Sequence, residues 1–213
     1  MRLIDWSLYA ILDRSAIRNR PIKQAAEEAI QGGASVIQLR NKAAHSDEFY
    51  QDAIEIKKVC QRYGIPLIIN DRLDIALAVG AEGVHLGQQD IPHKIARRLL
   101  GRDSILGISI HSIEEFERAK TSEPDYFGVG TIFPSQTKAE LATKGTGLVA
   151  AVRARTNKPL IAIGGLTPEN LGPVIRAGAD GVAVISSLWT AESIAARAQE
   201  FLQNIHDVTL TEL

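Results

Sequence analysis

The chain has few cysteines, few aromatic residues and no long apolar runs, and each shortage argues against a class of protein. Cys60 is the single cysteine, so no internal disulfide can form and a reducing, cytoplasmic setting is expected. No run of about 18 apolar residues occurs, which argues against a membrane-spanning helix. The formal net charge is −1, so no basic field is available to hold nucleic acid. Aromatic residues make up only 5%, and this composition favours an α/β protein over an all-β one.

What the chain does contain is a regular alternation of short apolar runs with helical patterns. The runs are apolar throughout, as in parallel strands that are covered on both faces. Together they predict a single domain over residues 1–213. The eight predicted strands lie near residues 8–12, 36–41, 66–70, 83–87, 105–110, 126–132, 159–164 and 181–186.

A repeated phrase indicates how these units are arranged. Glycine and alanine precede a valine by a few residues at 33–36, 80–84 and 178–182, and the first glycines lie 47 and 98 residues apart. These gaps correspond to two and four βα units of about 24 residues each. Eight such units can close into a (β/α)8 TIM barrel, which is the predicted fold. An open doubly wound sheet would place a glycine-rich phosphate loop after its first strand, but residues 13–16 contain no glycine.

Polar residues collect where the predicted strands end, which is where such barrels carry their chemistry. Gln38, Arg40 and Lys42 end the second strand, and residues two apart share one strand face. Arg offers a planar fork to phosphate oxygens and Lys offers a compact charge. The segment is therefore interpreted as an anion-binding strand end, although an exposed pair of cations is the simpler alternative.

Two carboxylates follow the third and fourth predicted strands. Asp71 and Asp90 would lie at adjacent strand ends, where they can share one hard cation. Mg2+ typically takes one or two carboxylates together with substrate phosphates. The alternatives for Asp71 are a helix cap or a salt bridge to Arg72 or Arg40, and for Asp90 a cap before the next helix.

The fifth predicted strand ends with two candidate polar groups. Ser109 can hydrogen-bond a substrate, and His111 can act as an acid or base. His111 can equally be an orienting residue beside the Ser112 cap, and this reading is preferred. His85 lies within an apolar run, which favours a buried structural histidine.

The last three loops carry the features of a phosphate site. Hydroxyls and a lysine occupy residues 135–138 after the sixth strand. Gly164 and Gly165 follow the seventh strand, and Ser186 and Ser187 follow the eighth. Glycines let a phosphate approach backbone N–H groups, and these loops form the usual phosphate-binding corner of the fold.

Taken together, these segments resemble the thiamine phosphate synthase family, also called thiamine-phosphate pyrophosphorylases. The resemblance covers the chain from about Leu8 to Leu188. It implies a Mg2+-dependent transferase that joins a hydroxymethylpyrimidine diphosphate to a thiazole phosphate and releases pyrophosphate. The matching segments are residues 38–42, 70–71, 85–90, 107–111, 134–138 and 163–165.

The resemblance also implies a role for each matching residue. The residues that would hold the pyrimidine diphosphate are Gln38, Arg40, Lys42, Asn70, Ser109 and Lys138. Those that would bind Mg2+ are Asp71 and Asp90. Those that would hold the thiazole phosphate are Ser135, Gln136, Thr137, Gly165, Ile185 and Ser186. The cations and the metal suit a leaving pyrophosphate, whose negative charge they can stabilise as it develops.

The related thiazole tautomerases are the nearest alternative. They share this barrel and isomerise a thiazole carboxylate phosphate, and His111 would be the base. That chemistry needs neither a diphosphate site nor a metal, so a tautomerase is free to lose Asp71, Asp90 and Lys138. This chain keeps all three, which favours the synthase.

Two further hypotheses are a non-catalytic phosphate-sensing barrel and a barrel enzyme of sugar or indole metabolism. A complete ligand set on several loops argues against the first. The second usually needs a catalytic carboxylate or lysine inside the barrel, and the predicted strand interiors offer no obvious pair. The expected partners are small phosphorylated substrates, with no nucleic acid and no membrane; homo-oligomer formation is left open.

Overall fold

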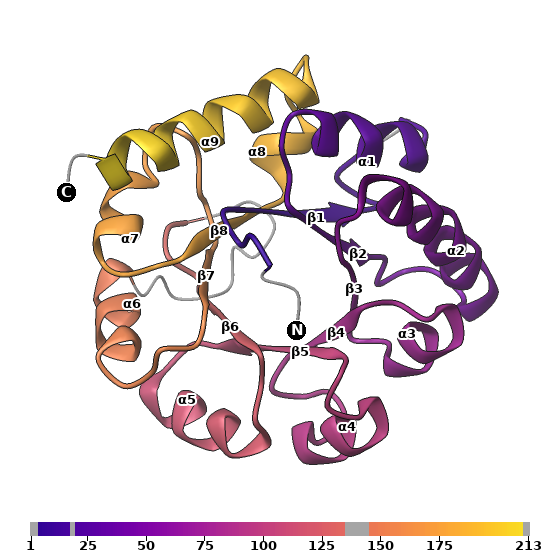
Figure 1. Ribbon diagram of the computed structural model, residues 1–213, viewed down its shortest axis with the longest axis horizontal. Helices are drawn as coiled ribbons and strands as arrows, with labels where there is room; N and C mark the ends of the chain where they lie inside the picture. Colours follow the sequence, from indigo (N-terminus) through magenta and orange to yellow (C-terminus); the bar gives the residue numbers. More distant parts are fainter. Residues whose placement is uncertain (1–3, 18–19, 135–144, 211–213) are drawn as a thin grey trace.

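The protein folds as a closed barrel of eight parallel strands, so the predicted (β/α)8 fold is confirmed. The computed structural model describes residues 4–17, 20–134 and 145–210. Each strand pairs with its neighbours in sequence order, and β8 pairs with β1 to close the ring (Figure 1). The strands are β1 (Leu8–Asp13), β2 (Val36–Arg40), β3 (Leu67–Asn70), β4 (Gly83–Leu86), β5 (Ile105–Ile110), β6 (Tyr126–Gly130), β7 (Leu160–Ile163) and β8 (Gly181–Val184).

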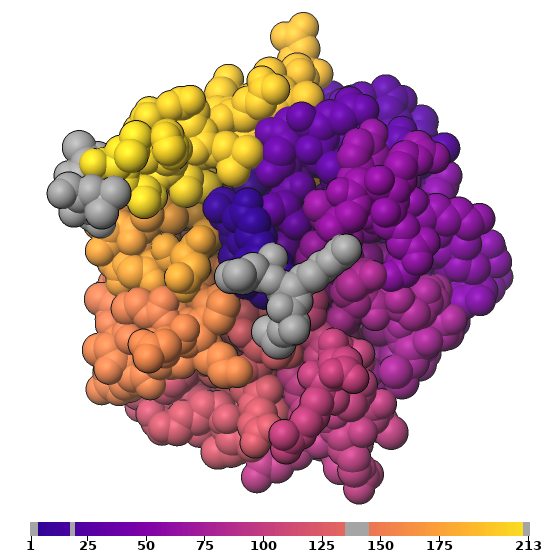
Figure 2. Space-filling model, viewed as in Figure 1, coloured from indigo at the N-terminus to yellow at the C-terminus, as the bar shows by residue number. Residues whose placement is uncertain are grey.

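The helices form an outer layer around this ring (Figure 1). Their sequence order runs round the molecule, and Figure 2 shows the C-terminal helix beside the N-terminal part of the chain. The helical elements are α1 (Ile22–Gln31), α2 (Ser46–Tyr63), α3 (Leu73–Val79), α4 (His93–Leu100), α5 (Ile113–Ala119), the 3-10 turn η1 (Lys120–Ser122), α6 (Gly145–Arg153), α7 (Gly172–Arg176), α8 (Ser186–Trp189) and α9 (Ile194–Leu210).

The apolar strands pack on both faces, which explains their continuous hydrophobic pattern. In β1, Leu8 and Leu12 belong to the core between the barrel and its helices, while Tyr9 and Ile11 belong to the barrel interior. Alternate residues therefore point to opposite sides, as the strand period of two requires. The strand ends differ slightly from the predicted ranges: β1 continues to Asp13, and β8 stops at Val184 because the chain turns into α8 there.

The N-terminal ends of the strands repeat one arrangement every two units. A carboxylate just before an even-numbered strand accepts a hydrogen bond from a backbone N–H of the preceding strand, at 2.8–2.9 Å. Each carboxylate also pairs with a basic residue of an earlier helix. The pairs are Glu82 with Lys57, Asp125 with Arg97, and Asp180 with Arg153.

The composition also led to expectations about the single cysteine and about membrane-spanning helices. Cys60 is buried in α2, and burial raises the pKa of its thiol to about 12, which leaves it unreactive. Among the described residues, no helix has both the length and the apolar character needed to cross a membrane.

Candidate active site

The arginine at the end of β2 lies at the carboxyl rim, where a buried carboxylate orients it. Arg40 forms an ion pair with Asp13, the last residue of β1 and only 2% exposed. The same carboxylate accepts hydrogen bonds from the backbone N–H and hydroxyl of Ser15, at 3.0 and 2.6 Å. Asp13 therefore fixes the guanidinium group and leaves its other N–H groups for an anion. Asp13 was not among the predicted site residues, although it lies two residues beyond Ile11 on the inward face of β1.

A second charged group forms between the ends of β2, β3 and β4. Lys42 Nζ lies 3.4 Å from Asp71 Oδ2, and the Asp90 carboxylate is close enough to repel that of Asp71. Burial, followed by repulsion from Asp90, raises the pKa of Asp71, and Lys42 offsets only part of this. The predicted alternatives for Asp71 are wrong: Arg72 pairs with Asp74, Arg40 pairs with Asp13, and the N-cap position of α3 is held by Arg72.

The backbone holds the two carboxylates in place. Asp71 adopts a left-handed conformation with φ of 62°, and its N–H donates to the carbonyl of His85 at 2.8 Å. Asp90 Oδ2 accepts a 2.6 Å hydrogen bond from the N–H of Gly87, which closes the turn after β4. The predicted carboxylate pair therefore does come together at adjacent strand ends.

The donor set fits a divalent cation that is shared with a substrate. Two facing carboxylates, one with a raised pKa, would be stabilised by a positive ion between them. Within the described part of the chain, no group of three or more His, Cys, Asp or Glu side chains could hold a metal alone. Water and phosphate oxygens would have to complete the coordination, as is usual for Mg2+.

Inside the barrel, Gln38 and Ser109 are joined by a continuous chain of hydrogen bonds. Gln38 Nε2 donates to the Tyr9 hydroxyl at 2.8 Å, and the hydroxyls of Tyr9 and Tyr126 lie 2.7 Å apart. The Tyr126 hydroxyl lies 2.9 Å from His85 Nδ1, and His85 Nε2 lies 2.8 Å from Ser109 Oγ. His85 is 8% exposed, so it is the buried, hydrogen-bonded histidine that was predicted.

On the other side of the rim, a cavity of about 290 Å3 opens between the ends of β5 to β8. Gly164 and Gly165 both adopt positive φ angles there, and a Cβ on Gly165 would lie 2.3 Å from the carbonyl oxygen of Pro134. Only glycine fits that position. The site residues lining this cavity are Ser109, His111, Gly165, Ile185 and Ser186.

His111 lines the same cavity but is held by the start of helix α5. Its Nδ1 lies 3.0 Å from Glu115 Oε2, and its backbone N–H donates to the same oxygen at 2.7 Å. Ser112 in turn accepts a hydrogen bond from the Glu115 N–H at 3.2 Å. The carboxylate thus orients the imidazole beside the predicted Ser112 cap.

The remaining predicted site residues are placed as follows. Asn70 is the last residue of β3 and is 9% exposed, next to Asp71. Four predicted binding residues lie outside the described part of the chain, and these are Ser135, Gln136, Thr137 and Lys138. The interior tyrosines Tyr9 and Tyr126 were not predicted, and the only local signal for them is their inward strand position.

A TIM barrel with oriented cations, a carboxylate pair and a glycine-lined cavity on one rim is an enzyme of the phosphate-binding class. A family model described as thiamine monophosphate synthase matches residues 8–188. The chain belongs to this family.

Individual relatives agree with that assignment. The thiamine-phosphate synthase of Clostridium acetobutylicum is 42% identical over 93% of this chain and 94% of its own length. That of Syntrophomonas wolfei is 45% identical over 93% of this chain and 96% of its own length. The solved structure of a thiamine phosphate pyrophosphorylase from Pyrococcus furiosus superimposes with a TM-score of 0.88 at 33% identity, over 96% of this chain and 98% of its own. The chain is accordingly a transferase, and these comparisons do not support the tautomerase alternative.

Proposed function

We propose that this chain is a thiamine phosphate synthase, which joins a hydroxymethylpyrimidine diphosphate to a thiazole phosphate and releases pyrophosphate. The observation that carries the proposal is the division of one rim into two anion sites. Arg40, Lys42 and the Asp71–Asp90 pair occupy one side, and the glycine-lined cavity occupies the other. A reaction between two phosphorylated substrates needs two such sites side by side.

The charged side of the rim suits the diphosphate. Arg40 is oriented by Asp13 and Lys42 is 60% exposed, so both present charge to the rim. Their positive charge would stabilise the pyrophosphate as its bond to the methylene carbon lengthens. The proposed diphosphate-binding residues are Gln38, Arg40, Lys42, Asn70, Ser109 and Lys138.

Asp71 and Asp90 are the residues that would hold Mg2+. When bound, the ion would neutralise charge on the diphosphate and so assist its departure. The two side chains would bind and orient the metal from the ends of β3 and β4, and Lys42 would remain beside them as a further cation.

The glycine-lined cavity suits the thiazole phosphate. Gly164 and Gly165, whose positive φ angles favour glycine, carry no side chains, so a phosphate can approach the backbone N–H groups of this corner. Ser187 donates a 2.7 Å hydrogen bond to the carbonyl of Leu166 and ties the loops after β7 and β8 together. The proposed binding residues are Ser135, Gln136, Thr137, Gly165, Ile185 and Ser186.

The reaction needs no strong general base. The aminopyrimidine ring can spread the positive charge left on its methylene carbon, so a dissociative substitution is favoured. The thiazole nitrogen that attacks carries no proton. His111, tied to Glu115, is therefore given no proton-transfer role in the synthase reaction.

The test is a direct assay. Purified protein is mixed with both substrates in Mg2+ and then in excess EDTA, and the amounts of thiamine phosphate and pyrophosphate are measured. The two products should form in equal amounts. Product that forms with Mg2+ and is lost with EDTA is expected. Absence of metal-dependent product contradicts the proposal, and turnover of the thiazole carboxylate tautomer alone would support the tautomerase instead. We further expect a cytoplasmic enzyme that acts on small phosphorylated molecules.

A further inference from the structure

The hydrogen bonds inside the barrel form a series that links Gln38 to Ser109. Which group donates in each of them affects how the Ser109 hydroxyl can bind a substrate. The series starts at Gln38 on β2 and ends at Ser109 on β5, where the side chain lines the 290 Å3 cavity. Its inner members come from β1, β6 and β4, and all are at most 8% exposed. They are Tyr9, Tyr126 and His85.

The hydrogens of these groups can be assigned in one consistent direction. The Gln38 amide nitrogen donates to the Tyr9 oxygen, and in a series that runs one way Tyr9 would donate its single hydrogen to Tyr126; the 2.7 Å separation fits donation by either hydroxyl. In the same direction, Tyr126 would donate its hydrogen to His85 Nδ1. A neutral imidazole with an accepting Nδ1 carries its proton on Nε2, and that N–H would then donate to Ser109 Oγ. The Ser109 hydroxyl hydrogen is therefore left to point away from His85.

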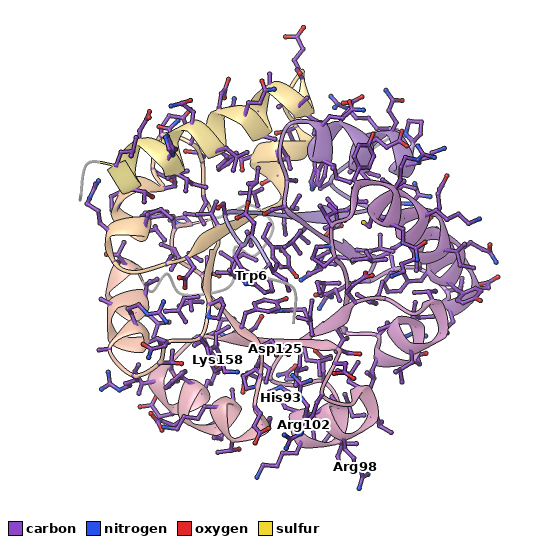
Figure 3. The ribbon with its side chains drawn as sticks, viewed as in Figure 1. Trp6, His93, Arg98, Arg102, Asp125 and Lys158 are labelled. Atoms are coloured by element: carbon purple, nitrogen blue, oxygen red, sulfur yellow. The ribbon has the colours of Figure 1, made fainter. Side chains whose placement is uncertain are left out.

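The surroundings keep both phenols neutral and in place. Burial raises the pKa of Tyr9 and of Tyr126 well above the usual value, so both hydroxyls keep their hydrogens. The ring centroids of Tyr126 and Trp6 lie 4.7 Å apart, and Figure 3 shows Trp6 near the centre of the ring of strands. A Cβ on Gly107 would lie 2.1 Å from the Tyr126 ring, so this glycine provides the space that the ring fills.

We propose that Tyr9, Tyr126 and His85 are positioning residues whose one-directional hydrogen bonds make Ser109 a hydrogen-bond donor toward the substrate. The proposal rests on the proposed function, because it takes Ser109 to face the pyrimidine diphosphate, although its side chain also lines the cavity assigned to the thiazole phosphate. A donor at this position selects a substrate that presents an acceptor there, such as an unprotonated ring nitrogen or a phosphate oxygen. A substrate that presents only a donor there would leave the Ser109 hydroxyl hydrogen without an acceptor on the substrate.

The first test measures the direction itself and needs no substrate. Long-range proton–nitrogen NMR of the ¹⁵N-labelled protein reports which ring nitrogen of a histidine carries the proton, and the His85 signal is identified by its loss in His85→Gln. The Nε2–H form is expected in the native protein, with a population of the Nδ1–H form appearing in Tyr126→Phe. A native Nδ1–H form would overturn the proposal.

The second test separates positioning from general packing. Tyr126→Phe keeps the ring but removes the hydroxyl, and kcat/KM for the pyrimidine diphosphate should fall about threefold to tenfold, the effect of one hydrogen bond. Tyr9→Phe should have a smaller effect, because Tyr126 can still donate to His85. Tyr50 lies on α2 and takes no part in this series of hydrogen bonds, so Tyr50→Phe is the matched control and should leave kcat/KM unchanged.

A double substitution decides whether the effect passes through Ser109. If it does, Tyr126→Phe should cause no further loss in a Ser109→Ala background. An equal loss in both backgrounds would show that the hydroxyl acts only on packing and would overturn the proposal. A native protein without synthase activity would refute the proposed function instead. The NMR measurement would still decide the direction of the hydrogen bonds from Gln38 to Ser109.

Discussion

At the scale of single residues, Asp71 illustrates how a binding site can lower stability. Burial and the Asp90 carboxylate raise its pKa, so its charged form destabilises the folded protein at neutral pH. We predict that Asp71→Asn lowers the synthase rate more than tenfold and raises the urea midpoint measured in EDTA. Asparagine also tolerates the left-handed φ of 62° at this position, which alanine tolerates less well.

The pH dependence of this stability gain has a definite sign. Because the pKa of Asp71 is raised on folding, the carboxyl takes up its proton more readily in the folded state, and lowering the pH relieves the penalty. The advantage of Asp71→Asn should therefore be largest near pH 7 and shrink as the pH falls through the raised pKa. Asp74 is the control, because its hydrogen bond to Arg72 lowers its pKa, so Asp74→Asn should not raise the midpoint. A midpoint that falls in Asp71→Asn would contradict the argument.

At the scale of elements, the carboxylates before the even-numbered strands differ in burial and should differ in energetic effect. Asp125 is 16% exposed and its partner Arg97 is 14% exposed, whereas Asp180 is 44% exposed. Removing Asp125 leaves the mostly buried guanidinium of Arg97 without its carboxylate and the Leu106 N–H without an acceptor. We predict that Asp125→Ala lowers the free energy of unfolding by about 3 kcal/mol and Asp180→Ala by about 1 kcal/mol.

Urea unfolding with unchanged m-values measures both effects. Since Asp125 lies at the N-terminal end of the strands, away from the rim, kcat of the folded Asp125→Ala protein should match that of the native protein. Equal destabilisation by the two substitutions would show that burial does not determine how much each carboxylate contributes to the free energy of unfolding.

The elements also show how far the sequence could lead. The strands are predictable because both of their faces are buried, which makes each one an apolar run. Gln38 and Arg40 are predictable as a pair because a period of two places them on one face of β2, whereas Lys42 lies beyond the end of that strand. The pairing of Asp13 with Arg40 depends on the register between β1 and β2, which no local pattern specifies. The contact of Tyr9 with Tyr126 joins strands that are not neighbours in the sheet, so only the closed barrel reveals it.

At the scale of the whole molecule, the barrel closes where the two ends of the chain meet, and close helix packing holds that seam. Gly32, at the end of α1, faces α9, and a Cβ there would lie 2.4 Å from the Ala195 carbonyl oxygen and 2.7 Å from Ala198 Cβ. Its φ is −77°, so alanine would be strained by the neighbouring helix and not by its own backbone. We predict that Gly32→Ala destabilises the fold by about 1–3 kcal/mol, as overpacking does.

Gly147 provides the matched substitution, because it lies within α6 and a Cβ there would meet no atom within 4 Å. Gly147→Ala should stabilise the protein by about 0.5–1 kcal/mol, since alanine restricts the unfolded chain and favours the helix. The same chemical change should therefore shift the urea midpoint in opposite directions at the two sites. If Gly32→Ala also raised the midpoint, the contact between α1 and α9 would not be close-packed. Closure of the barrel would then depend on the pairing of β8 with β1 and on a hydrogen bond from Trp189. The indole N–H of Trp189 donates to the Ile11 carbonyl at 2.6 Å.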